Sequence, residues 1–237
     1  MTDELYLPDQ GDGSYRNPVL CCDYSDPDVI RVGDTYYMTA SSFNYVPGLP
    51  ILTSADLVNW RLVNYALPNI PEPGYEIPRH ACGVWAPAIR WHDGFFYIYY
   101  GMPDEGIYMV RAADACGQWD APKLVRAGKG LIDPCPFWDD DGRAYVIHAY
   151  ANSRIGFKSR IGIFPMSADG THAIGEDKFL FDGTANHPTI EGPKVYKRDG
   201  WYYIFAPAGG VATGWQTVLR SRRIDGEYED RIVLRQG

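Results

Sequence analysis

The strongest constraint on the fold of this chain is a hairpin pattern that occurs four times. Each copy has a run of strand-forming residues, a turn that contains Gly or Asp, and a second run rich in aromatic residues; the copies begin at Asp28, Ala88, Pro136 and Pro193. Asp-Gly between two such runs is a strong short-range signal for a β-hairpin. The repeated hairpins therefore predict an all-β fold.

A second recurring piece follows each hairpin and lengthens the repeat. It reads as a strand, a turn that contains Asp, and another strand, and the turn aspartates are 58, 55 and 56 residues apart: Asp56, Asp114, Asp169 and Asp225. A repeat of about 40–50 residues with four strands is typical of a β-propeller blade, and longer loops account for the excess. The sequence predicts a propeller of about four blades, and a β-sandwich with accidentally regular spacing is the alternative.

Length and charge narrow the class of protein. A chain of 237 residues suits one all-β domain, so residues 1–237 are predicted to form a single propeller domain. The chain has 22 Lys and Arg against 30 Asp and Glu, which gives a net charge of −8. An acidic chain without a basic cluster is a poor candidate for binding nucleic acid or an anionic membrane, and neutral ligands fit better.

The cysteines and the first residues bear on the cellular compartment. Five cysteines are present, the number is odd and no CxxC motif occurs, which argues against a disulfide framework and against a cysteine zinc site. The first ten residues, MTDELYLPDQ, are acidic and polar and do not resemble a signal peptide. No apolar run approaches the roughly 18 residues that span a bilayer. These features predict a cytoplasmic protein that does not enter a membrane.

Carboxylates recur at equivalent positions of the repeat. Trp85, Asp133 and Glu191 each lie nine residues before the turn glycine of their hairpin. In the first hairpin Asp34 takes the place of the glycine, and Asp26 lies eight residues before it. The first strand of each propeller blade lines the central channel. We therefore expect these four side chains to meet at one mouth of the channel.

Three carboxylates gathered in one pocket indicate chemistry. Their mutual repulsion raises at least one pKa and costs stability, so catalysis or a bound cation explains the cluster better than a structural need does. Two carboxylates with different pKa values suit glycoside hydrolysis, and Trp85 offers an apolar face to a sugar ring. A single Asp before Pro is usually a turn or cap residue. The equivalence of the positions across the repeat is what favours a functional site.

The motifs around these residues resemble one enzyme family. They read NPVLCCDYSDPDVIRVGDTYYMTASSFNYVPGLPILTSADLVNW, GVWAPAIRWHDGFFYIYYG, LIDPCPFWDDDGRAYVIHAY and IEGPKVYKRDGWYYIFAPAGG. In this order they resemble glycoside hydrolase family 43, whose five-bladed propellers include β-xylosidases and α-L-arabinofuranosidases. The resemblance covers about residues 15–215. It implies an inverting, exo-acting glycosidase that releases xylose or arabinose from oligosaccharides of plant hemicellulose.

The resemblance also implies a role for each candidate residue. Asp26 matches the general base that activates water, and Glu191 matches the general acid. Asp133 matches the residue that adjusts the pKa of the acid and orients it. Phe43 and Trp85 match aromatic residues that wall the subsite of the terminal sugar. Phe43 is assigned by the resemblance alone, whereas the repeat had already selected the other four.

The sequence departs from the family in length. Four blades are recognisable where the family has five, and neither a fifth blade nor the C-terminal β-sandwich of many members follows. We therefore expect a missing C-terminal segment or a second copy to complete the fold. The resemblance implies no required cofactor and allows a structural calcium in the complete propeller.

Two alternatives to the glycosidase stay open at this point. The chain as it stands could be a non-catalytic carbohydrate-binding propeller fragment. A retaining β-fructosidase-type propeller enzyme is the other alternative. That type usually has Arg-Asp-Pro in mid-chain, where this sequence has Ile132, Asp133 and Pro134.

Overall fold

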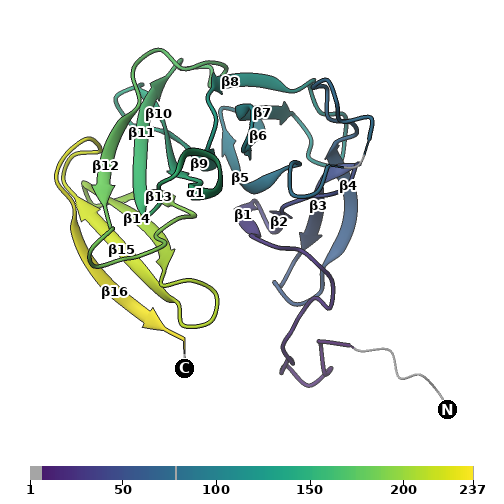
Figure 1. The fold of residues 1–237 in the computed structure, drawn as a ribbon. Helices are drawn as coiled ribbons and strands as arrows, with labels where there is room; N and C mark the ends of the chain where they lie inside the picture. The colour runs from purple at the N-terminus through teal and green to yellow at the C-terminus, as the bar shows by residue number, and fades with distance from the viewer. Residues whose placement is uncertain (1–6, 78, 237) are drawn as a thin grey trace.

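Four antiparallel sheets make up the protein, each formed by four strands in sequence order (Figure 1). The computed structural model describes residues 7–77 and 79–236. The first sheet contains β1 (Asp28–Val32), β2 (Thr35–Thr39), β3 (Gly48–Ser54) and β4 (Arg61–Leu67). The second contains β5 (Trp85–His92), β6 (Phe95–Met102), β7 (Gly106–Ala112) and β8 (Lys123–Ala127). These sheets are the first two blades of the predicted propeller.

The other two sheets follow the same order. The third contains β9 (Leu131–Trp138), β10 (Ala144–Tyr150), β11 (Arg160–Met166) and β12 (Lys178–Asp182). The fourth contains β13 (Lys194–Arg198), β14 (Trp201–Ala208), β15 (Trp215–Ser221) and β16 (Glu229–Arg235). A four-residue helix, α1 (Asn152–Ile155), lies between β10 and β11. The prediction of about four propeller blades is confirmed, and the sandwich alternative is wrong.

The predicted turns connect the strands as the sequence indicated. Asp93 and Gly94 join β5 to β6 with φ angles of 45° and 83°. Asp199 and Gly200 join β13 to β14 with φ angles of 52° and 72°. Positive φ at both central residues is what a two-residue hairpin turn needs to match the twist of its strands. Asp56, between β3 and β4, accepts hydrogen bonds from the backbone N–H groups that follow it.

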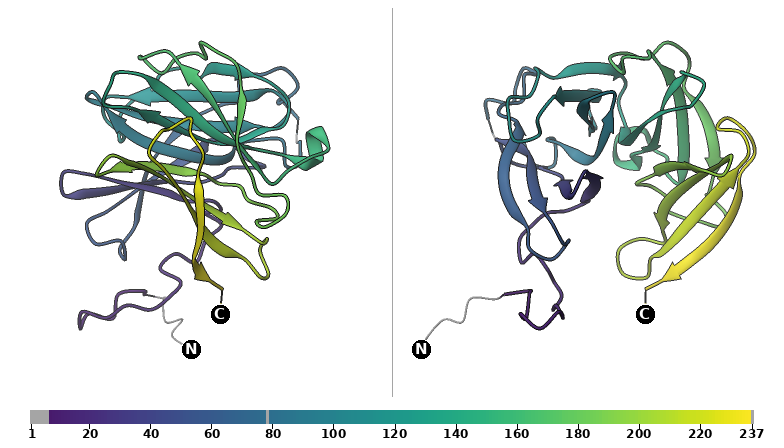
Figure 2. Two further views of the ribbon diagram at one scale, coloured as in Figure 1. Left: turned by 90° about the vertical axis from the view of Figure 1, so that its left-hand side faces the viewer. Right: turned by 180° about the vertical axis from the view of Figure 1, so that it is seen from behind.

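The inner strands of neighbouring blades lie side by side. β1 contacts β5, β5 contacts β9, and β9 contacts β13. Figures 1 and 2 show the blades as an arc that is open between the first blade and the fourth. The first strand of each blade therefore faces the axis, as the propeller interpretation requires.

Apolar side chains fill the space between neighbouring blades. Leu49 and Ile51 of the first blade pack with Ile98 of the second in one buried cluster. A second cluster joins the second and third blades, and a third joins the third and fourth blades. The middle strands β6 and β10 are buried along almost their whole length, so both faces of these blades need a neighbouring blade to cover them.

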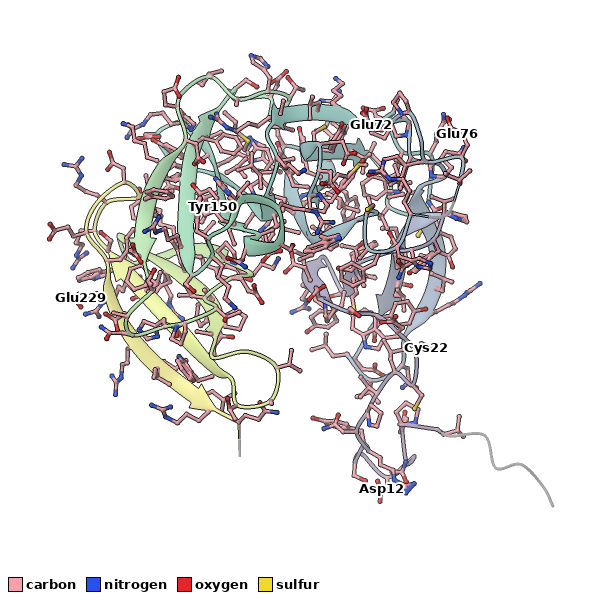
Figure 3. The ribbon with its side chains drawn as sticks, in the orientation of Figure 1. Asp12, Cys22, Glu72, Glu76, Tyr150 and Glu229 are labelled. Carbon is pink, nitrogen blue, oxygen red and sulfur yellow. The ribbon has the colours of Figure 1, made fainter. Side chains whose placement is uncertain are left out.

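An N-terminal segment runs away from the first blade. Figure 3 labels Asp12 and Cys22 on this segment, and the side chain of Asn59, between β3 and β4, donates a hydrogen bond of 2.9 Å to Asp9 of the segment. The five cysteines are all free: Cys21, Cys22, Cys82, Cys116 and Cys135. Among the described residues, no helix has the length and apolar character to cross a membrane.

Candidate active site

A cleft of about 550 Å³ lies where the inner strands of all four blades meet. Its lining residues are Asp26, Pro27, Phe43, Trp85, Ala86, Ile132, Asp133, Glu191, Gly192, Lys194 and Pro207. All five residues singled out in the sequence are among them. The three carboxylates come from three different blades, and only the folded arc brings them to one wall.

Asp26 and Asp133 both have an unusual backbone conformation. Their φ angles are 50° and 55°, in the left-handed region that few residues other than glycine adopt. Asp26 lies two residues before β1, whereas Asp133 lies within β9. Strained backbone of this kind concentrates at functional sites, where it aims a side chain that regular strand geometry would direct elsewhere.

Asp133 is the most deeply buried of the three carboxyl groups. Its side chain accepts a hydrogen bond of 2.8 Å from the backbone N–H of Gly192. Burial raises the pKa of Asp133 to about 7, and the negative charge of Glu191 adds to this effect. The N–H of Gly192 and the charge of Lys194 oppose it. Asp133 therefore keeps its proton to a higher pH than an exposed aspartate does.

Glu191 is half-buried, and its backbone is held by the fourth blade. Its N–H donates a hydrogen bond of 3.1 Å to the carbonyl oxygen of Pro207 on β14. Burial is the main reason that the pKa of Glu191 is raised. Lys158 lowers that pKa, and the charge of Asp26 raises it. A carboxyl group of this kind keeps its proton to a higher pH than an exposed glutamate does.

Asp26 has one fixed hydrogen-bond partner in the cleft. The hydroxyl of Ser41 donates to its Oδ2 over 2.7 Å. Asp28, two residues further on, makes a buried ion pair of 2.6 Å with Arg90 and accepts the N–H of Ile89 over 2.9 Å. The charge of Asp28 is therefore compensated, and Asp28 is not among the residues that line the cleft.

Phe43 and Trp85 form the aromatic part of the cleft wall. Their rings meet edge to face, with centroids 5.8 Å apart and an angle of 79° between the planes. The indole N–H of Trp85 donates to the carbonyl oxygen of Ala81 over 3.2 Å. The guanidinium of Arg154 lies 5.3 Å from the centre of the indole and pairs with Asp104 over 3.2 Å. These contacts hold both rings in defined orientations.

Two residues of the site were not found from the sequence. Lys194 lines the cleft, and its ammonium group donates to the carbonyl oxygen of Pro87 over 3.2 Å. It stands in the motif EGPK beside Glu191, but nothing in the sequence places its charge near Asp133. Ser41 is the second, and its partner lies 15 positions away. Neither residue follows the repeat that selected the carboxylates.

The arrangement of the carboxylates also bears on metal binding. The described residues include no group of three or more His, Cys, Asp or Glu side chains that is arranged to hold a metal ion. The cation explanation for the cluster thus finds no support within these blades. A structural calcium in a complete propeller stays a prediction, and no step of the chemistry below depends on it.

Comparison with known proteins identifies the family of the chain. The model of glycosyl hydrolases family 43 matches residues 15–235. A Xylanibacter ruminicola protein named "Putative beta-xylosidase" is 49% identical over 230 residues, which cover 97% of this chain and 42% of that protein. A non-reducing end α-L-arabinofuranosidase of Bacteroides ovatus is 33% identical over 230 residues, with 93% and 41% covered.

Solved structures give the same result. The crystal structure of a xylan β-1,4-xylosidase from Bacillus halodurans matches with a TM-score of 0.77 and 31% identity, covering 91% of this chain and 43% of that one. The chain thus spans 42% and 43% of the length of these two relatives. The family match leaves the β-fructosidase-type alternative without support. The chain belongs to family 43 of the glycosyl hydrolases.

Proposed function

We propose that this chain carries the catalytic carboxylates of an inverting, exo-acting glycosidase that releases xylose or arabinose from hemicellulose-derived oligosaccharides. The observation that carries the proposal is the convergence of Asp26, Asp133 and Glu191 on one cleft beside Phe43 and Trp85. Its volume of about 550 Å³ is within the usual range for a small-molecule site.

The carboxylates take different roles because their surroundings differ. Glu191 is the general acid, since burial keeps its proton available for the oxygen of the leaving group. Asp26 is the general base that takes a proton from the attacking water. Asp133 positions the acid, because it is bonded to the backbone N–H of Gly192, the residue next to Glu191. Its own charge state also influences when Glu191 loses its proton.

The walls of the cleft suit a neutral sugar ring. Phe43 and Trp85 present apolar faces and edges, and sugars pack their C–H surfaces on such rings. Relatives of the chain are named as β-xylosidases and as an α-L-arabinofuranosidase, which supports a pentose as the released sugar. The choice between the two pentoses is open to direct assay.

The test is hydrolysis of xylobiose, an arabinofuranosyl-xylose disaccharide and the two 4-nitrophenyl pentosides by the 237-residue chain. We expect Glu191→Ala to lower kcat on the disaccharide by about 10²–10⁴-fold, the usual contribution of a general acid. The loss on the nitrophenyl substrate is smaller, because nitrophenolate leaves without protonation. An equal loss on both substrates would contradict the acid role.

Glu229→Ala is the matched control for this substitution. Glu229 lies on β16 of the same blade, is exposed and pairs with Arg220 at the outer edge (Figure 3). We expect it to keep wild-type turnover. Proton NMR of the first product then gives the anomer, and retention of configuration would overturn the inverting mechanism. Sugar binding without turnover by the wild-type chain would favour the carbohydrate-binding alternative.

A further inference from the structure

We propose that Ser41 is the positioning residue of the general base: its hydroxyl occupies Oδ2 of Asp26 and leaves Oδ1 to accept the proton of the attacking water. The inference rests on the proposed function, because it assigns to Asp26 the role of base. It concerns a residue that neither the repeat nor the family motif singled out.

The direction of the hydrogen bond follows from the charge of the partner, because an ionised carboxylate can only accept. The backbone N–H of Ala86 donates to the Ser41 oxygen over 2.8 Å. A backbone N–H can only donate, so the serine oxygen accepts there and its own hydrogen is free to point elsewhere. The oxygen of Asp26 lies 2.7 Å away. The hydroxyl therefore donates to the ionised carboxylate while its oxygen accepts the N–H of Ala86.

Two blades hold the serine in place. Its N–H donates to the carbonyl oxygen of Ser25, the residue before Asp26, over 2.9 Å. Ser42 forms a β-bridge with Val84 through two backbone hydrogen bonds of 3.1 and 3.2 Å. Ser41 itself is 3% exposed. With both neighbours fixed and the side chain buried, the hydroxyl has little freedom to leave its partner.

The contact also joins the base to the sugar platform. Ala86 follows Trp85 directly and has a φ angle of 30°, so its N–H departs from the regular ladder of β5. That N–H is bound to Ser41 instead of a neighbouring strand. One hydroxyl thus links the strand that carries the aromatic wall to the carboxylate that activates water, and it sets the distance between them.

The hydrogen bond has a defined effect on proton transfer. A hydrogen bond to the charged form of a carboxylate favours that form. It also prevents the side chain from turning, so the same oxygen faces the water in each turnover. The other charged groups that line the cleft are Asp133, Glu191 and Lys194. These three residues are the same in every variant of Ser41. A difference in the titration of Asp26 between the variants therefore comes from the substitution of the serine.

Ser54 is a matched control in the same blade. It is 5% exposed, its hydroxyl donates to Asp56 over 2.9 Å, and its oxygen accepts the backbone N–H of Leu57 over 2.9 Å. The same arrangement of donor and acceptor thus serves a turn between β3 and β4, away from the cleft. Ser54→Ala removes an equivalent set of hydrogen bonds without touching Asp26.

The first test is an NMR titration of the Asp26 side-chain carboxyl carbon in the ¹³C-labelled chain, assigned by its loss in Asp26→Asn. We expect the titration midpoint to lie higher in Ser41→Ala than in the wild-type chain, since a hydrogen bond to the charged form of the carboxylate is lost. Ser54→Ala keeps the wild-type midpoint. An unchanged midpoint in Ser41→Ala would overturn the proposal.

Two further variants test the role of the hydroxyl even if Ser41→Ala does not fold. Ser41→Cys keeps a side chain of similar size with a weak donor, so its midpoint also rises. Ser41→Thr keeps the hydroxyl and returns the midpoint to the wild-type value. A rise in the threonine variant equal to that in the cysteine variant would show that packing and not the hydroxyl controls the carboxylate, and would overturn the proposal.

The second test separates this inference from the proposed function. In steady-state hydrolysis of the disaccharide, we expect Ser41→Ala to lower kcat about tenfold and to leave KM within about twofold, because one hydrogen bond of about 1.4 kcal/mol is lost from the base. A wild-type kcat in Ser41→Ala overturns only the role of Ser41. A titration shift in a chain without glycosidase activity overturns the proposed function and the positioning role with it.

Discussion

Two aspartates six positions apart, Asp133 and Asp139, show how far the surroundings of a residue control its charge. Both are nearly buried. Burial and the charge of Glu191 raise the pKa of Asp133 to about 7. Burial acts in the same direction on Asp139, but hydrogen bonds from Lys197 and Tyr202 outweigh it and lower the pKa of that group. The ionised form of Asp133 therefore destabilises the fold, whereas the ionised form of Asp139 stabilises it.

The raised pKa of Asp133 predicts how the stability of the protein depends on pH. Folded Asp133 holds its proton to a higher pH than the unfolded chain does, so the folded state loses stability as pH rises from about 4 to about 7. Asp133→Asn removes the charge and still accepts the N–H of Gly192. We expect its Tm to exceed that of the wild type at about pH 8 and the two to converge near pH 4. A lower Tm at both pH values would contradict this.

Asp139→Asn is the control of opposite sign. The lowered pKa of Asp139 means that its ionised form contributes stability above the unfolded value of 3.8, and that this contribution is lost as pH falls through the folded value. The variant leaves Lys197 without its buried partner. We expect a lower Tm than the wild type at about pH 8, with the difference shrinking in acid.

Within the third blade, one glycine allows a polar network to form. Asp177 accepts hydrogen bonds from the side chains of His148 over 2.9 Å and Tyr150 over 2.8 Å. Both donors lie on β10, and Tyr150 is marked in Figure 3. Gly162 on β11 faces them: a Cβ there would lie 2.4 Å from the Tyr150 oxygen and 2.6 Å from the His148 Nε2. Because Gly162 has no side chain, both rings have room to reach the carboxylate of Asp177.

We expect Gly162→Ala to lower the free energy of unfolding by about 2 kcal/mol, the usual cost of overfilling a packed interior. Urea denaturation measures it. Gly117→Ala is the control, since Gly117 lies in an exposed turn and its added Cβ would meet Asp114 at an ordinary 3.4 Å. Equal losses in the two variants would show that the network is not what the glycine protects.

At the scale of the whole molecule, the described blades form an arc and not a closed ring. The three buried clusters lie between the first and second, the second and third, and the third and fourth blades. Within the described residues, no such cluster joins the fourth blade to the first. The fourth blade carries a hollow of about 470 Å³ beside Glu191, with Trp215 in its wall. Val211 and Leu234 line it and are 98% and 69% exposed.

An exposed apolar surface of this kind favours self-association. We expect the sedimentation coefficient of the chain to rise with concentration. Replacing Val211 and Leu234 together by Lys is expected to abolish that rise, because the added charges are costly to bury. Leu124→Lys is the control: Leu124 is 45% exposed on β8, in a blade with neighbours on both sides. A rise that persists in the double variant would place the contact elsewhere.

Several features of the fold and the site were predictable because the repeat depends on short-range sequence patterns. Asp-Gly turns and the strand-forming runs on either side of them act over a few residues, so the hairpins and the number of blades follow from them. Since equivalent positions of a propeller face one axis, the convergence of Asp26, Asp133 and Glu191 on one cleft could also be predicted. Their catalytic roles stay predictions until the variants are assayed.

The sequence by itself determined the four blades and the positions of the carboxylates within them, because both depend on short-range patterns. Only the tertiary structure decided which groups surround each carboxylate. The hydrogen bond from Ser41 to Asp26, that from Ala86 to Ser41, and the charge of Lys194 beside Asp133 all arise where blades or loops meet. Burial and contacts across blades set charge and orientation, and neither is encoded in the residues adjacent to the site.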